Sequence, residues 1–91
     1  MKIYLIKAHD QSRPYDYHVG FVVAARSPGE ARRTVCSTHF AKEEWEHELG
    51  QHEIDERKFW MDPEMASCTD IGDYTHHNTW PHVLLADYRA G

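Results

Sequence analysis

The sequence predicts an α+β fold: an antiparallel sheet of three to five strands, with one or two helices packed on one face. Two observations lead to this prediction. Apolar stretches typical of strands lie near both ends of the chain, and a strong helix-start signal follows the second of them. The order strand, strand, helix and then further strands is typical of a sheet that one helical layer covers. With 91 residues, we expect a single domain spanning 1–91.

The first two predicted elements are strands. In residues 2–8, Ile3 and Leu5 share one face while Tyr4 and Ile6 share the other, so both faces are expected to be covered. Residues 9–16 have the polar and proline-containing composition of a loop. Residues 18–25 form the second strand, where Gly20 indicates a bulge or a close approach of another backbone. One face of this strand is expected to carry Val19, Phe21, Val23 and Ala25.

A helix is predicted to begin directly after the second strand. Ser27 is placed as N-cap, Pro28 occupies the first helical position, and Glu30 completes a capping box. In that box the Ser27 hydroxyl accepts from the Glu30 amide, and the Glu30 carboxylate accepts from the Ser27 amide. The apolar stripe of this helix consists of Ala31 and Val35, and the solvent side is expected to carry Arg32 and Arg33.

The rest of the chain predicts one more helix and three short strands. Residues 40–49 place Ala41, Trp45 and Leu49 on one helical face, with Gly50 as C-cap, and residues 51–56 form a polar connection. Strands are expected at 58–61, 67–71 and 82–88, with a short turn at 62–64 and a loop at 72–81. The strand 82–88 is apolar on both faces, so it and the first strand are predicted to lie in the middle of the sheet.

The acidity of the chain is concentrated in one segment. The formal net charge is −5, yet residues 43–56 hold seven acids and no lysine or arginine, while the remainder holds ten basic and eight acidic residues. We call residues 43–56 the acidic segment. We expect it to bind a protein partner with a basic surface. Its acids, all predicted to take part, are Glu43, Glu44, Glu46, Glu48, Glu53, Asp55 and Glu56.

Charge and composition exclude several other classes. A net negative charge argues against direct nucleic-acid binding, where basic side chains must neutralise phosphates. Apolar runs of five residues or fewer leave no membrane-spanning segment and no signal-peptide core. Two cysteines, Cys36 and Cys68, are too few for the disulfide framework of a small secreted domain. We therefore expect a cytoplasmic protein with two free thiols.

Two residue sets leave an enzymatic alternative open. His39, Glu43 and His47 are four apart and would form a zinc-ligand stripe on an unbroken helix, although the spacing is not diagnostic. Cys68 with His76 or His77 as base would form a nucleophilic pair, for which no oxyanion hole is identifiable. We assign no catalytic residue, no metal and no cofactor from these patterns.

The aromatic residues exceed what so small a core requires. Trp45 and Trp60 are predicted to pack internally, whereas Tyr15, Tyr17 and Trp80 are expected in loops. Tyrosine and tryptophan dominate the binding energy of protein interfaces. These loop aromatics are therefore candidate anchors for a partner or a second copy.

Several short blocks resemble small accessory proteins encoded by tailed bacteriophages and prophages. The blocks cover most of the chain and lie at residues 1–6, 20–25, 27–32, 60–64, 67–71 and 83–91. Residues 38–58 look like a longer insert than that pattern usually has. The resemblance implies a non-structural phage protein that acts on a host component in the host cytoplasm. Inhibitors of bacterial defence, including anti-CRISPR proteins, are the most familiar such class, and no catalytic residues come with it.

The predicted function is therefore that of a small phage-type protein that binds, and thereby inhibits, a host protein through its acidic surface. The alternatives are a small metal-dependent or cysteine-based enzyme and a purely structural dimerising module. We expect a monomer or homodimer.

Overall fold

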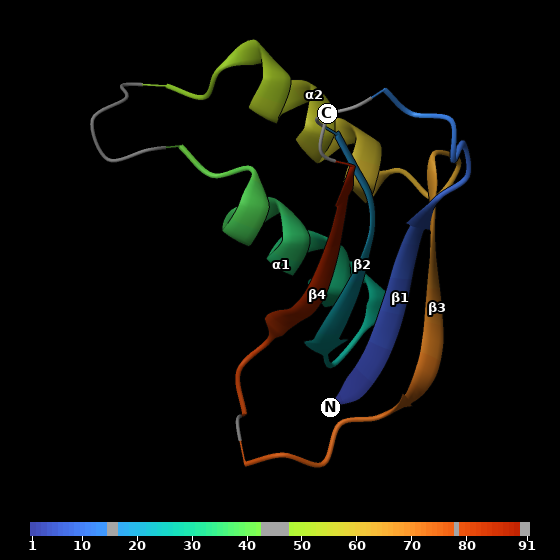
Figure 1. The fold of residues 1–91 in the computed structure, drawn as a ribbon. Coiled ribbons are helices and arrows are strands. Elements are labelled where there is room, and N and C mark those ends of the chain that lie inside the picture. Colours follow the sequence, from blue (N-terminus) through green and yellow to red (C-terminus); the bar gives the residue numbers. More distant parts are fainter. Residues whose placement is uncertain (15–16, 43–47, 78, 90–91) are drawn as a thin grey trace.

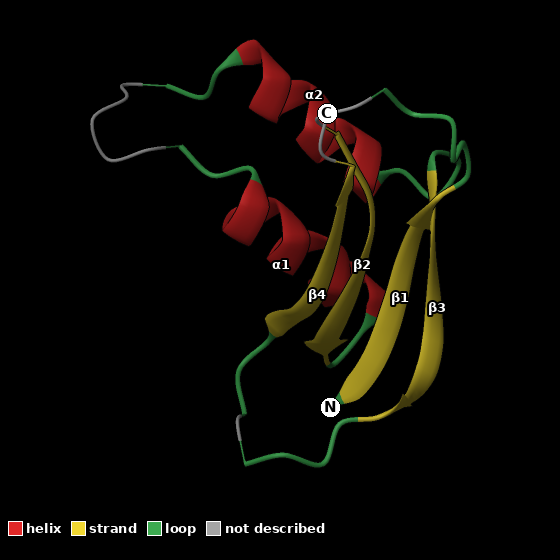
Figure 2. Ribbon diagram, viewed as in Figure 1, coloured by secondary structure: helices red, strands yellow, loops and turns green. Residues whose placement is uncertain are grey.

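The computed structural model describes residues 1–14, 17–42, 48–77 and 79–89, and it confirms the α+β fold. The elements are β1 (Lys2–Ala8), β2 (Tyr17–Ala25), α1 (Pro28–His39), α2 (Gln51–Met61), β3 (Ala66–Asp73) and β4 (His82–Arg89). The strands form a sheet in the order β3-β1-β2-β4, with antiparallel neighbours throughout. Both helices lie on one side of this sheet (Figure 1), which leaves the other side without a helical layer (Figure 2).

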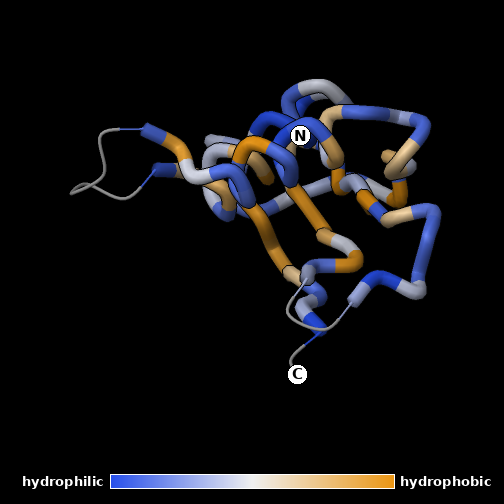
Figure 3. Tube along the Cα trace, turned by 90° about the horizontal axis from the view of Figure 1, so that it is seen from above, coloured by the Kyte–Doolittle hydropathy of each residue, from blue (hydrophilic) through white to orange (hydrophobic). Residues whose placement is uncertain are grey.

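The core fills the space between the sheet and the two helices. Its largest fully buried side chains are Trp60, Phe21, Ile6, Val23 and Val35. Seen from above in Figure 3, the most hydrophobic stretches include the strands at the centre, and many of the polar ones lie in the outer connections. No helix in the described ranges is long and apolar enough to cross a membrane.

The two central strands follow their predicted alternation, with one exception. Tyr4 and Ile6 of β1 face the core, and Ile3 and Leu5 are only half-buried on the opposite face. In β2 the pairing with β4 shifts between His18 and Gly20, which confirms the expected bulge. The added residue is Val19, which is buried like Phe21, Val23 and Ala25 but does not belong to the core cluster that those three join.

Gly20 also marks a close backbone approach. A Cβ at this position would lie 3.2 Å from the Ile6 carbonyl oxygen, closer than almost all real Cβ contacts. A larger residue would therefore push β1 and β2 apart at the bulge.

The start of α1 confirms the predicted N-cap but differs in the second hydrogen bond of the box. The Ser27 hydroxyl accepts from the Glu30 amide at 3.1 Å, as predicted. The Glu30 carboxylate accepts from the Arg26 amide at 2.9 Å, one residue earlier than the expected Ser27 amide. The expected solvent position of Arg32 is also wrong, because that side chain is buried, whereas Arg33 is exposed.

The second helix lies later in the chain than predicted. Residues 41, 42, 48 and 49 are not helical, and Trp45 lies outside the described residues. Gly50 is the N-cap of α2 and not a C-cap, and residues 51–61, expected as a connection and a strand, are helical. The buried stripe of α2 is Glu56 and Trp60, four residues apart. A carboxylate in that stripe hid the helical pattern in the sequence.

The C-terminal strands are longer than predicted, and one lies elsewhere in the sheet. β3 extends the expected strand at 67–71 by a residue or two at each end. β4 is an edge strand, so the prediction that the first and last strands form the middle of the sheet is correct for β1 only. The two-sided apolar pattern of β4 arises because Val83 and Ala86 pack on the core while Leu84 and Leu85 are exposed.

Candidate functional site

The side of the sheet turned away from the helices carries two aligned rows of side chains. In one row, Leu5 pairs with Val22 and Val22 with Leu85. In the next row, Lys7 pairs with Gly20 and Gly20 with Asp87. We call the surface formed by Leu5, Lys7, Val22, Leu85 and Asp87 the open face.

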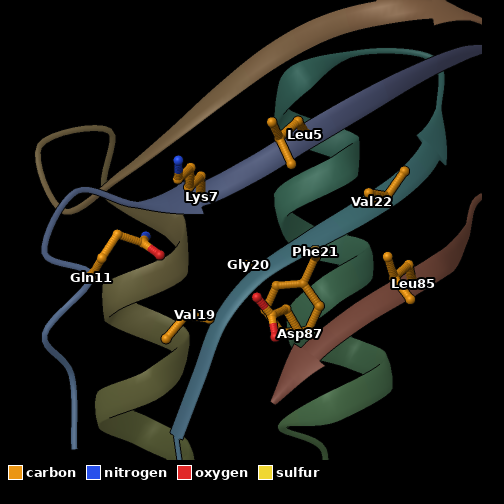
Figure 4. Close-up of a pocket in the computed structure, with 9 residues that line it drawn as sticks. All are labelled: Leu5, Lys7, Gln11, Val19, Gly20, Phe21, Val22, Leu85 and Asp87. Atoms are coloured by element: carbon orange, nitrogen blue, oxygen red, sulfur yellow. The ribbon is translucent and has the colours of Figure 1, made fainter. Parts of the chain in front are cut away.

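A shallow hollow of about 240 Å³ lies on this open face. Figure 4 shows that its side chains come from β1, β2 and β4, with Gln11 from the loop after β1 at its margin. Gly20 lines the hollow between Lys7 and Asp87 without contributing a side chain. The bulged Val19 adds a further apolar group.

The two charged groups of the open face are not paired with each other. Lys7 and Asp87 lie on the strands either side of β2, so about 10 Å of sheet separates their Cα atoms. Within the described ranges, neither side chain forms a salt bridge or side-chain hydrogen bond, and both residues are exposed. The open face is thus an apolar row beside a second row that has a cation at one end, an anion at the other and Gly20 between them.

The two edges of the sheet differ in character. At the β3 edge, Lys2 of β1 forms salt bridges with two aspartates of β3, Asp73 at 2.6 Å and Asp70 at 3.9 Å. The hydrogen bond and charge between Lys2 and Asp73 raise the pKa of the lysine and lower that of the aspartate. Ile71 is the exposed large apolar residue of this edge. The β3 edge is therefore mainly polar.

The β4 edge carries a concentration of exposed apolar side chains. Of the seven large hydrophobic residues that are exposed in the described ranges, four lie on β4 or just before it. These are Trp80 (60% exposed), Leu84 (41%), Leu85 (63%) and Tyr88 (48%). Leu84 has no partner in the register with β2, because the pairing skips one residue between Val83 and Leu85. An edge strand with exposed apolar side chains, such as Leu84 here, is a preferred place for another chain to add.

The acidic segment is less exposed than its composition suggested. Glu48 and Asp55 are exposed and Glu53 is half-buried, whereas Glu43, Glu44 and Glu46 lie outside the described residues. Glu56 is only 3% exposed, so it does not contribute to an acidic surface. Burial is possible because its carboxylate accepts a hydrogen bond from Arg13 at 2.6 Å.

Arg13 is a residue whose importance the sequence did not reveal. Its guanidinium group lies 4.1 Å from the centre of the Phe59 ring, 4.8 Å from that of Tyr17 and 5.5 Å from that of Trp60. Together with the Glu56 contact, this fixes the loop after β1 against α2. A lone arginine in a polar loop gives no signal of such a role.

A histidine pair lies where the end of α1 meets the start of β2. The rings of His18 and His39 are 5.3 Å apart, and both contact Phe21. Burial lowers the pKa of both histidines, and for His18 the charge of His39 adds to this effect while Glu56 opposes it. The Nδ1 atom of His39 is buried without a hydrogen-bond partner.

The predicted zinc set is not assembled in the described part of the chain. Glu43 and His47 lie outside it, and the His39 ring is engaged by His18 and Phe21. Among the residues that the structure describes, no group of three or more ligand-type side chains is placed to hold a metal ion.

The thiols lack the surroundings of a nucleophile. Cys36 is buried and Cys68 half-buried against the core, and burial raises the pKa of each thiol. A reactive cysteine needs the opposite shift. The Cys68 thiol donates a weak hydrogen bond to the Pro28 carbonyl, and the His76 ring packs on Tyr74. Among the described residues, no hydrogen bond joins Cys68 to His76 or His77.

The aromatic residues singled out in the sequence lie in different surroundings in the structure. Trp60 is fully buried in the core, as predicted, and Trp80 is exposed before β4. Tyr17 lies at the start of β2 against Arg13 and His52, and Tyr15 lies outside the described residues. Trp80 is the candidate anchor that remains available to a partner.

Comparison with known proteins adds no relative. The chain matches no family model, no curated protein and no solved structure, so its function has to be argued from its own residues.

Proposed function

We propose that this chain is a protein-binding module whose partner adds to the sheet along β4. The observation that supports this most directly is the concentration of exposed apolar side chains on that edge. A strand laid against β4 would bond to its outward backbone groups and cover Leu84 and Trp80 at the same time. Edge addition needs neither a cofactor nor a catalytic group.

The chemistry of the partner follows from the charge of the chain. A net charge of −5 disfavours nucleic acid and favours a protein with a basic surface. The exposed Glu48 and Asp55 belong to the acidic segment, whose role in this proposal is to speed encounter with that surface. In line with the resemblance to phage accessory proteins, the partner is a bacterial host protein, such as a defence component, that binding inhibits.

The first experiment separates the β4 edge from the rest of the sheet. Leu84→Lys places a charge on the proposed docking edge, and Ile71→Lys makes the same change at a position on the β3 edge that is also exposed (53% against 41%). Partners captured from bacterial lysate by the unaltered chain are purified and titrated against both variants. We expect Leu84→Lys to weaken binding by at least about tenfold, because an unpaired charge is desolvated at the docked edge.

Ile71→Lys should bind as the unaltered chain does. Equal affinity for all three proteins, or an equal loss in both variants, would overturn docking at β4. Circular dichroism at the titration temperature verifies that each variant is folded.

The second experiment tests the acidic segment. Replacing Glu43, Glu44, Glu46 and Glu48 by lysine should lower the association rate for the purified partner by about tenfold or more at low salt. Replacement by glutamine at the same positions removes the charge without reversing it and should give a smaller loss. Stopped-flow association at several salt concentrations measures both. An association rate that does not change in either variant would remove the acidic segment from the proposal.

A further inference from the structure

The open face is arranged to meet a second copy of itself. Its apolar row of Leu5, Val22 and Leu85 lies beside a second row, in which Lys7 on β1 and Asp87 on β4 lie on either side of Gly20. We propose that two copies pack these faces together around a two-fold axis that runs along β2, so that each Lys7 meets Asp87 of the second copy. This interface covers the open face of β4, including Leu85, whereas the proposed protein partner adds along the outer edge of that strand.

The register of the sheet determines which residues would meet. A two-fold axis along β2 exchanges the positions of β1 and β4 and keeps each residue in its row. Leu5 then lies over Leu85 of the second copy, and Val22 lies over itself. In the neighbouring row, Lys7 lies over Asp87 of the second copy on both sides of the axis. Such an interface is isologous, because the same patch serves both chains.

The charges also reject the alternative orientation. A two-fold axis across the strands would place Lys7 over Lys7 and Asp87 over Asp87 of the second copy. Like charges at close range suppress that arrangement. The two charges therefore specify one orientation, in which the strands of both sheets run along the same line, as in aligned sheet packing.

Gly20 makes the close packing of the two sheets possible. It lies on the proposed axis between Lys7 and Asp87, and all three residues line the hollow of about 240 Å³. Packed sheets lie about 10 Å apart, a distance that side chains from both faces must fill. The long side chain of Lys7 in each copy reaches towards the shorter Asp87 of the other copy, beside the space that Gly20 leaves.

The size of the sheet sets the expected strength. Four strands about 4.8 Å apart and about 23 Å long present roughly 400 Å² of flat surface. A standard interface buries about 800 Å² per partner. The dimer is therefore weak, with a dissociation constant in the range of about 10–500 µM.

The test is a charge exchange between two chains. Sedimentation equilibrium between about 5 µM and 1 mM, at low salt, should show a monomer–dimer equilibrium for the unaltered chain. Lys7→Glu and Asp87→Lys, each alone, should dissociate at least about tenfold more readily, because each faces two like-charged contacts. Both positions are exposed, so the fold is preserved.

An equimolar mixture of the two variants provides the decisive result. One chain then carries carboxylates at both positions and the other carries ammonium groups at both, so the mixture should form a heterodimer. An unaltered chain that stays monomeric throughout, variants that dimerise normally, or a mixture that stays monomeric would each overturn the proposal. Leu84→Lys should leave the self-association unchanged, which keeps this interface distinguishable from docking at β4.

Discussion

At the level of single residues, two arginines from different parts of the chain are almost removed from water. Arg32 is 8% exposed and donates to the carbonyl oxygens of Trp60, at 2.9 Å, and Ala66, at 2.8 Å. It thereby joins α1 to the end of α2 and the start of β3. Arg13 serves the loop after β1 in a comparable way through Glu56.

Replacing Arg32 should therefore destabilise the fold more than replacing an exposed arginine on the same helix. Arg32→Met removes both hydrogen bonds and leaves two buried carbonyl groups unpaired, a loss of about 2–4 kcal/mol in the free energy of unfolding. Arg32→Lys should lose less stability than Arg32→Met but remain below the unaltered chain, because one ammonium group cannot donate to both carbonyl oxygens with the geometry of a guanidinium group. Urea unfolding measures the change from the shift in midpoint at constant slope.

The neighbouring Arg33 supplies the control. It is exposed on the same helix, and Arg33→Met should alter stability by no more than about 0.5 kcal/mol. Similar losses at the two positions would show that the Arg32 hydrogen bonds do not hold the elements together.

At the level of elements, helices and strands that depend on neighbouring residues could be predicted from the sequence, whereas those that depend on distant contacts could not. The Ser27 cap and the alternation of β1 act within a few residues, and both are confirmed. The position of α2 depends on Glu56 being neutralised by Arg13, 43 residues earlier in the chain. No local pattern reveals that a carboxylate will be buried by so distant a partner.

The contact between α1 and β2 makes the fold sensitive to acid. His18 is faced by titratable or charged groups from every element around it, namely His39, His52, Glu56, Arg13 and Tyr88. Burial lowers the pKa values of His18 and His39 in the folded state, so the unfolded chain binds protons more readily. Their contribution to stability is complete above the usual histidine pKa of about 6.5 and is lost as the pH falls below it.

The corresponding measurement is the urea midpoint between about pH 7.5 and 5. His18→Phe replaces the titrating ring by one of similar shape and should flatten the decline across this range. His77→Phe, at an exposed loop position, should retain the slope of the unaltered chain. Identical slopes in the His18 variant and the unaltered chain would exclude the histidine pair as the source.

At the level of the whole molecule, the candidate site was only partly predictable. The α+β class and the helix layer on one face followed from the sequence. The position of β4 did not, because apolar residues on both faces indicate a strand with neighbours on both sides. Leu84 and Leu85 give β4 this apolar pattern, although β4 is an edge strand and both side chains are exposed. Under the proposed docking at β4, the added strand would make β4 an inner strand of the sheet, as the sequence pattern predicted.

The acidic segment illustrates a different limit. Composition predicted a continuous charged surface, whereas burial removes Glu56 from it and Asp55 accepts a hydrogen bond from Gln51 within α2. A count of acids does not distinguish a solvated carboxylate from one that is neutralised in the interior. The orientation of each side chain on α2 had to come from the fold.

The strand order has a consequence for how the chain is synthesised. β1 and β2 leave the ribosome before β3 and β4, yet it is β3 and β4 that cover their outer edges. At about 5–20 residues per second, the nascent hairpin waits several seconds with its edges unpaired and its apolar faces uncovered. Two ribosomes translating one message bring such hairpins close together during that interval. We therefore expect translation speed and chaperone supply to affect the yield of this protein strongly. The effect should be smaller for a domain in which each new strand pairs with the strand made just before it.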